Sequence, residues 1–362
     1  MAETLVDPSK CTVDGPGVQN AEVSTLAHFS INIPHTSGNP EPELEIRAEL
    51  KSLVDDSTVQ VQVIERGSGI YDGTYVPTMR GHHHLSVEVN GEPIIGSPYP
   101  VFVTIPLTRL RNPVRIMNEV ELPQYITINN KQQIVVSEAY KGLAVLDKKG
   151  TRVLEVEMKK KDGSPRDPMG VAVDEEDNMY VVEREEGCIS KYDRNGKHLR
   201  SSVARELKWP WGLQLIDAEL YVCEHDDHQI MIFDKEQLVQ SSTQLRFFNH
   251  PRDLTTDEKG TLYVADVGIN RIHVLADGKV IRVIHGVPSP SGVCYDHKRQ
   301  VLYVAEQLNC RVSVFTPNGD HLYSFGKKGT KEGELNSPMG LAVDGDGYVY
   351  VCDSGNGRIQ VF

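Results

Sequence analysis

A pattern of about forty residues recurs along the second part of this 362-residue chain and constrains the fold more than any other feature. Each copy opens with a proline and an apolar segment, and a turn then leads to a second apolar segment that ends on an acidic residue. The six prolines are Pro123, Pro168, Pro210, Pro251, Pro290 and Pro338. Such a repeat is typical of chains whose units bury their apolar faces against neighbouring units.

The segments inside each copy predict strands. The second segments read IVVSE, MYVVE, LYVCE, LYVAD, LYVAE and VYVCD, and the third read LAVLD, ISKYD, IMIFD, IHVLA, VSVFT and IQVF. β-Branched and aromatic residues at a period of two favour strands. A polar turn and a fourth strand follow in the first five copies. Four strands in each of six copies predict a six-bladed β-propeller.

The last copy ends at Phe362 without a fourth strand. Residues 114–121 (VRIMNEVE), just before the first copy, resemble the fourth strands of other copies, such as VIRVIHG. We expect this N-terminal strand to complete the last sheet, because closing the ring removes two exposed sheet edges.

The repeat signature resembles a known family. P-x-G-[LV]-A-V-D followed by Y-V-x-D-x-G-N-x-R-I-x-V-F, present as PMGLAVDGDGYVYVCDSGNGRIQVF, is similar to the NHL repeat. The resemblance covers residues 112–362 and is strongest in the fourth to sixth copies. The first and third copies, PQYITI and PWGLQLI, depart from it because they lack Ala-Val-Asp.

The first 106 residues carry different motifs. DPSKCTVDGPGV and YDGTYVPTMRGHHHLSVEVNGEPIIGSPYPVFV resemble a filamin-type immunoglobulin repeat. The residues themselves predict a sandwich, because LSVEV alternates and Asn90-Gly91 suits a type I′ hairpin turn. We therefore expect an all-β chain with an immunoglobulin-like β-sandwich at residues 1–106, a short linker at 107–113 and the propeller at 114–362.

A filamin-type repeat followed by an NHL propeller is similar to the C-terminal half of the tripartite-motif NHL proteins. In that family a RING finger, B-boxes and a coiled coil come first, and the whole is a ubiquitin ligase whose C-terminal half selects the target. No C-x2-C series precedes Asp7, so we expect this chain by itself to be non-catalytic. The resemblance implies RNA or target proteins as ligands of the propeller.

Charge and composition indicate where a ligand surface lies and which cellular compartment is expected. The formal net charge is −13, of which about −9 precedes residue 107 and about −4 follows, so any anion-binding surface is expected in the propeller. MAETLVDPSK lacks the apolar core of a signal peptide, and no run approaches the length of a membrane span. The six cysteines are scattered without zinc spacing. These features predict a cytoplasmic protein with reduced thiols and no membrane association.

One face of the propeller, here called the loop face, is expected to carry the loops between second and third strands and those that join successive copies. Basic and aromatic residues gather in these segments, as RNA binding requires, because cations attract phosphates and rings stack on bases. The candidates are Lys159, Lys160, Arg166, Lys208, Trp211, Arg246, Phe247, Arg252, Arg271, Arg311, Lys328 and Arg358. We expect single-stranded or hairpin RNA as the ligand, post-transcriptional regulation as the function, and no cofactor or metal.

Structural roles compete with this interpretation. An acid ends every second strand, and an arginine opens the third strand in the last three copies, as Arg271, Arg311 and Arg358. This spacing favours an acid–arginine pair within each of these copies. In the first three copies we expect the acids to cap backbone N–H groups instead. Trp209 and Trp211 are as compatible with the core as with a binding site.

Other functions also stay open. Acidic segments at 183–186 and 225–228 lie on the loop face and would repel phosphate, which favours a protein-binding propeller that recruits ubiquitination targets or cytoskeletal partners. The acidic sandwich is interpreted as a spacer or a docking module that accepts an added strand. A metal-dependent enzyme using His225, His228 and His250 is the third alternative, although the inner strands show no repeated ligand pattern.

Overall fold

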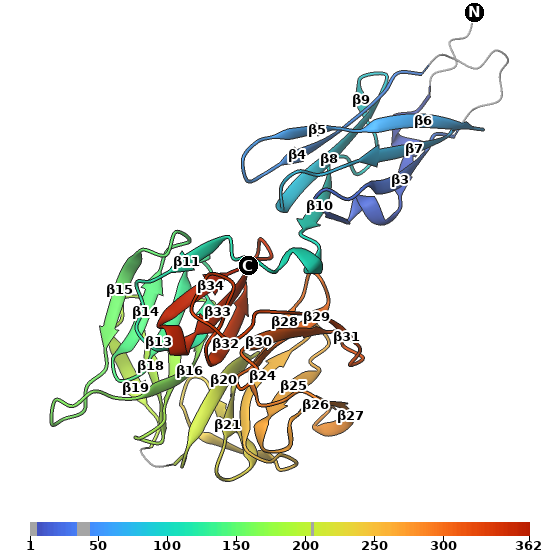
Figure 1. Cartoon of the computed structure of the whole chain (residues 1–362). Helices are drawn as coiled ribbons and strands as arrows, with labels where there is room; N and C mark the ends of the chain where they lie inside the picture. Colours follow the sequence, from blue (N-terminus) through green and yellow to red (C-terminus); the bar gives the residue numbers. More distant parts are fainter. Residues whose placement is uncertain (1–5, 35–43, 204–205) are drawn as a thin grey trace, which may run out of the picture. The chain divides into compact units, whose positions relative to one another are not determined.

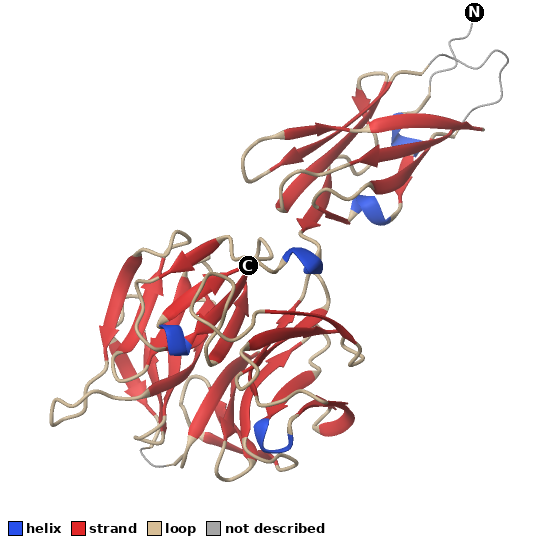
Figure 2. Ribbon diagram, in the orientation of Figure 1, coloured by secondary structure: helices blue, strands red, loops and turns tan. Residues whose placement is uncertain are grey.

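In the computed structural model of the protein, residues 6–34, 44–203 and 206–362 are described (Figure 1). The chain forms two compact units, and along the sequence the boundary falls between Arg109 and Leu110. Strands dominate both units, and the described helices are short 3₁₀ turns (Figure 2): η1 (Pro8–Lys10), η2 (Pro16–Val18), η3 (Leu107–Arg109), η4 (Val267–Ile269) and η5 (Ser354–Asn356). No helix in these residues is long and apolar enough to cross a membrane.

The first unit contains two sheets, with strand orders β1-β3-β7-β6 and β2-β10-β8-β4-β5, and β9 pairs with β8. The strands are β1 (Thr12–Asp14), β2 (Asn20–Glu22), β3 (Ala27–Asn32), β4 (Ile46–Ser52), β5 (Thr58–Gln60), β6 (Gln62–Gly67), β7 (Ile70–Tyr75), β8 (Gly81–Val89), β9 (Glu92–Pro93) and β10 (Tyr99–Thr104).

Burial alternates along the central strands of this unit. In β3 and β8 every second residue is buried, and the inward side chains of both sheets, such as Ile31 and Val87, form one core. This is the arrangement of a β-sandwich. Asn90 and Gly91, between β8 and β9, have φ angles of 53° and 80°, and the positive values at both positions confirm the predicted type I′ turn.

In the described residues, the second unit contains six four-stranded sheets. Five of them consist of four consecutive antiparallel strands each. The first sheet contains β12 (Pro123–Ile128), β13 (Ile134–Glu138), β14 (Gly142–Leu146) and β15 (Arg152–Glu157), and the second contains β16 (Pro168–Val173), β17 (Met179–Glu183), β18 (Cys188–Tyr192) and β19 (His198–Ser201). The third contains β20 (Pro210–Ile216), β21 (Glu219–Glu224), β22 (Gln229–Asp234) and β23 (Gln240–Leu245), the fourth contains β24 (Pro251–Thr256), β25 (Leu262–Asp266), β26 (Arg271–Ala276) and β27 (Lys279–His285), and the fifth contains β28 (Pro290–Asp296), β29 (Val301–Glu306), β30 (Arg311–Phe315) and β31 (His321–Phe325).

The remaining sheet joins the two ends of the unit. It comprises β32 (Pro338–Val343), β33 (Val349–Asp353), β34 (Arg358–Val361) and, beyond β34, the early strand β11 (Arg115–Met117). Arg115 lies opposite Val361 and Met117 opposite Ile359, in antiparallel register. The segment that was expected to complete the last sheet therefore pairs with β34.

The first strands of the sheets pack side by side in chain order, and β12 also packs beside β32. The P-x-G motif explains how closely they approach. A Cβ added at Gly212 would lie 2.6 Å from the carbonyl oxygen of Arg252 in the next sheet, and one at Gly340 would lie 2.7 Å from Cα of Tyr125. The glycine is therefore required because the backbone of the neighbouring sheet occupies the place of a side chain.

Candidate functional site

The strand register places two sets of loops at one edge of every sheet in the second unit, and these loops are the loop face. The turns between second and third strands are residues 139–141, 184–187, 225–228, 267–270, 307–310 and 354–357. The connections that precede each first strand are 118–122, 158–167, 202–203 with 206–209, 246–250, 286–289 and 326–337.

A carboxylate ends the second strand of each of these sheets, directly beneath the loop face. The six are Glu138, Glu183, Glu224, Asp266, Glu306 and Asp353, each 0% exposed. Each lies opposite the proline that opens the first strand, as in the pairs Pro123–Glu138 and Pro338–Asp353. Because an unpaired buried charge is strongly destabilising, the partners of these acids determine which loop-face cations remain available to a ligand.

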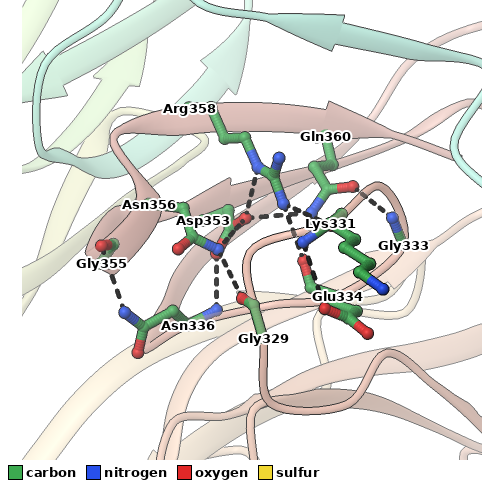
Figure 3. Close-up of polar contacts among 10 residues, drawn as sticks. All are labelled: Gly329, Lys331, Gly333, Glu334, Asn336, Asp353, Gly355, Asn356, Arg358 and Gln360. Carbon is green, nitrogen blue, oxygen red and sulfur yellow. Dashed lines mark hydrogen bonds and ion pairs between the residues drawn. The ribbon is translucent and has the colours of Figure 1, made fainter.

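The predicted acid–arginine pair is confirmed in the last two sheets. Nε of Arg311 lies 2.8 Å from Glu306, and Nε of Arg358 lies 2.7 Å from Asp353. Figure 3 shows the second network, in which Arg358 also donates to the carbonyl oxygens of Lys331 (2.7 Å) and Glu334 (3.0 Å). Each arginine therefore pairs with the acid of its own sheet, and Arg358 also holds the connection before β32 in place.

The prediction is wrong for Arg271. Its Nε donates to the carbonyl oxygen of Ile269 (3.3 Å), which the short turn η4 presents just before the strand. Asp266 instead accepts from the backbone N–H of Asn249 (2.9 Å) and lies 3.1 Å from Nε2 of His273.

His273 belongs to a pattern that the sequence reasoning missed. The third residue of the third strand faces the buried acid in four sheets, as Ser190, His273, Ser313 and Gln360. A polar residue recurring two places after the strand start was the available signal, because alternate residues of a strand face the same side.

The first three sheets pair their acids in two ways. Glu224 accepts from the backbone N–H groups of Lys208 and Trp209, both at 2.8 Å, as the capping prediction requires. Burial raises the pKa of Glu224. Glu138 also accepts from a backbone N–H, that of Glu121 (2.6 Å), and in addition pairs with Arg152 on β15 at 2.8 Å. Glu183 pairs with Arg166 in the preceding connection.

Arg166 was a ligand candidate, and its partner gives it a structural role. The lysine candidates are also mostly paired: Lys159 lies 2.6 Å from Glu157, Lys160 lies 2.5 Å from Glu185, and Lys208 contacts Asp227. Lys328 is exposed and has no carboxylate partner in the described residues. Surface pairs of this kind add little stability, but they reduce the positive charge that a phosphate would meet.

Two arginines stack on the tryptophans. The guanidinium carbon of Arg252 lies 4.5 Å from the ring centroid of Trp211, and that of Arg184 lies 5.1 Å from the same centroid and 5.0 Å from that of Trp209. Trp211 is only 9% exposed, so it cannot stack on a base unless an arginine moves away. Arg184, which the sequence reasoning did not select, pairs with Asp167.

The three histidines of this region pack on one another. The ring centroids of His225 and His228 lie 4.4 Å and 4.3 Å from that of His250. Burial lowers the pKa of His225, and Arg252 contributes to the lowering. Within the described residues, no group of three His, Cys, Asp or Glu side chains is arranged to hold a metal ion.

Large apolar side chains are exposed on the loop face. Leu308 is 79% and Phe247 56% exposed, and the full set is Leu122, Tyr140, Val203, Trp209, Phe247 and Leu308. The other exposed large apolar residues recorded for this unit lie in or directly before outermost strands: Val114, Val153, Leu199, Val239, Val280, Ile281 and Leu322. Arg246, beside Phe247, is exposed as well.

Two family models match separate parts of the chain. Residues 5–100 match the Filamin/ABP280 repeat, and residues 212–362 match the SMP-30/Gluconolactonase/LRE-like region. The chain is also 28% identical over 142 residues to peptidyl-glycine alpha-amidating monooxygenase A of Xenopus laevis, and 54% identical over 39 residues to the E3 ubiquitin-protein ligase TRIM71 of Rattus norvegicus. These segments cover 34% and 11% of this chain, and 15% and 5% of the two relatives.

Solved structures share the fold at low sequence identity. A streptogramin B lyase structure has a TM-score of 0.54 at 14% identity and covers 68% of this chain and 96% of that chain. An auxiliary nutrient binding protein from Bacteroides thetaiotaomicron has a TM-score of 0.52 at 12% identity and covers 98% of both chains. The comparisons and the sheets together show an all-β chain with a filamin repeat followed by a propeller-like region.

Proposed function

We propose that the loop face is a protein-recognition surface, and that the chain is the target-binding part of a tripartite-motif NHL-type protein. The observation that carries this proposal is the set of large apolar side chains in the loop-face segments, among cations that are mostly paired with carboxylates. Exposed apolar and aromatic residues gathered on one face are typical of protein interfaces. The filamin repeat and the short similarity to TRIM71 support the family assignment.

The proposal includes an architecture. We infer that the six sheets are blades of one closed ring spanning residues 114–362, preceded by an immunoglobulin-like domain at 1–106 and a linker at 107–113. The pairing of β11 with β34 and the packing of β12 beside β32 support closure. A closed ring would hold the loop-face side chains in fixed positions, as a recognition surface requires.

The test compares two double variants that each replace two exposed apolar residues with aspartate. Phe247→Asp with Leu308→Asp changes the loop face, and Leu199→Asp with Ile281→Asp changes outer strands of the same unit. Crosslinking in cells followed by mass spectrometry should show proteins that the wild type and the outer-strand variant retain and the loop-face variant loses. Equal recovery of those proteins by both variants would contradict the proposal.

RNA is the second candidate ligand, and one observation favours it. Trp209 and Phe247 expose aromatic rings in the same face as Arg184, Arg246 and Lys328, so bases could stack beside cations. Sequencing of RNA crosslinked to the same variants tests this candidate. If RNA is the ligand, reversing Arg246 and Lys328 to Glu makes the slope of log K against log salt shallower by roughly 0.7 to 0.9 per lost phosphate contact, whereas reversing Lys149 and Lys197 on the opposite face leaves it unchanged.

A further inference from the structure

Arg252 has a positive charge that no carboxylate in the described residues pairs with. Its Nη1 donates to Oε1 of Gln307 (2.7 Å), which is a neutral acceptor. Its Nε is buried and has no hydrogen-bond acceptor among the described residues. Burial lowers the pKa of Arg252, and the nearby charge of Arg184 lowers it further. An anion at this position would therefore stabilise the guanidinium group.

The side chains stacked around Arg252 present further unused donors. Nε of Arg184 and Nε1 of Trp211 are both buried, and neither has an acceptor in the described part of the chain. Arg184 pairs with one carboxylate, that of Asp167. Three unused N–H donors thus lie on Trp211 and on the two arginines stacked on it, and of the two guanidinium groups only that of Arg184 has a carboxylate partner among the described residues.

We infer that Arg184, Arg252 and Trp211 form a subsite for the carboxylate of an acidic side chain presented by the partner protein. The inference rests on the proposed function and names the chemistry that this surface selects. Guanidinium groups bind carboxylates through paired, charge-assisted hydrogen bonds. One aspartate or glutamate supplies the single negative charge that the two arginines and Asp167 lack.

The surroundings favour a peptide carboxylate over a polyanion. Leu308 directly follows Gln307, and Trp209 lies under Arg184, so apolar contacts are available beside the charged group. Lys160 and Lys208 on the same face are already paired with Glu185 and Asp227, which leaves less positive charge for the many phosphates of a nucleic acid. An acidic residue flanked by apolar ones satisfies both features.

The experiment follows the indole N–H signals of the full chain by NMR. The chain has two tryptophans, so there are two indole signals, which a Trp209→Phe variant assigns. The probe is N-acetyl-glutamate methylamide, which has one carboxylate, and the matched control is N-acetyl-glutamine methylamide. We expect the glutamate probe to shift the Trp211 signal with a dissociation constant of about 1 mM, the range for a ligand of this size, and the glutamine probe to leave it unchanged.

Variants then test the arginine. Arg252→Gln should weaken the glutamate probe at least about tenfold, Arg252→Lys should weaken it less, and Arg194→Gln on the opposite face should have no effect. If Arg252→Gln does not fold, the glutamate and glutamine probes compared on the wild-type chain still test whether a carboxylate binds beside Trp211.

Two results would overturn the inference. One is an equal response to the glutamate and glutamine probes, including no response to either. The other is tighter binding of inorganic phosphate or a uridine hexamer than of the glutamate probe, which would favour RNA. If the glutamate probe is silent while the Phe247 and Leu308 variant still loses its protein partners, the inference fails and the proposed function stands. If the glutamate probe binds while the Phe247 and Leu308 variant keeps its protein partners, the inference stands and the proposed function fails.

Discussion

At the scale of the single residue, burial without a cationic partner raises the pKa of one carboxyl group, that of Asp253. Asp253 on β24 occupies the place that glycine has in the P-x-G motif, and it is buried against the next sheet. Its Oδ2 accepts from the backbone N–H of Val293 (2.9 Å), and burial raises its pKa to about 7. The acids beneath the loop face differ from it because most of them have a cationic partner.

Asp253 gives a prediction about pH. The unfolded carboxyl has a pKa near 3.8 and the folded one about 7. Between these values the folded state holds a proton that the unfolded state releases, so stability falls as pH rises and levels off above about pH 7. Asp253→Asn removes this dependence.

The measurement is the free energy of unfolding in urea at pH 5 and pH 8. Between pH 5 and pH 8 the free energy of unfolding of the wild type should fall by about 3 kcal/mol relative to that of Asp253→Asn. An unchanged difference would show that Asp253 is ionised throughout.

At the scale of the strand, one acid organises the end of an element and the loop beside it. Asp353, at the end of β33, accepts from the backbone N–H of Asn336 (2.7 Å), from Nδ2 of Asn356 and from Nε2 of Gln360 (3.0 Å), in addition to Arg358 (Figure 3). These partners come from β34, from η5 and from the connection before β32. The shape of the loop face here therefore depends on one carboxylate.

Asp353→Asn should lower the free energy of unfolding by about 3–5 kcal/mol, because it leaves the largely buried guanidinium of Arg358 without its counter-charge. Urea unfolding of the full chain measures the change. Asp277→Asn is the matched control, because Asp277 is an exposed turn residue with a φ of 49°, which asparagine also adopts. A loss below about 1 kcal/mol for Asp353→Asn would mean that the pair contributes no more than a surface ion pair.

At the scale of the second unit, the sheets form a repeated contact between first strands. At four glycines of the P-x-G motif the backbone of the next sheet lies where a Cβ would be: Gly170, Gly212, Gly292 and Gly340. The last of these contacts the first sheet. With β11 paired to β34, the start and the end of the unit share one sheet. We therefore expect a change at either end to affect the stability of the whole unit.

Deleting residues 114–121 should lower the melting temperature and broaden the transition, because β34 loses its hydrogen-bonded neighbour and becomes an exposed edge. The rescue variant carries the same residues after Phe362, joined by a short turn like those between the third and fourth strands of the other sheets. It should recover the cooperative transition in calorimetry. An unchanged melting temperature for the deletion would rule out closure as a source of stability.

The sequence by itself determined the repeat and its strands, because apolar period, prolines and turn residues act over a few neighbours and recur six times. The spacing of five residues between acid and arginine also predicted the pairs of Arg311 and Arg358, although the same spacing gives no pair at Arg271. Only the tertiary structure decided the candidate site. Arg166 and Arg152 reach buried acids from other elements, Arg271 turns to a local carbonyl, and Trp211 lies beneath Arg184 and Arg252 from two different sheets. Which cation remains available to a ligand depends on contacts between residues far apart in the chain, and no local pattern encodes them.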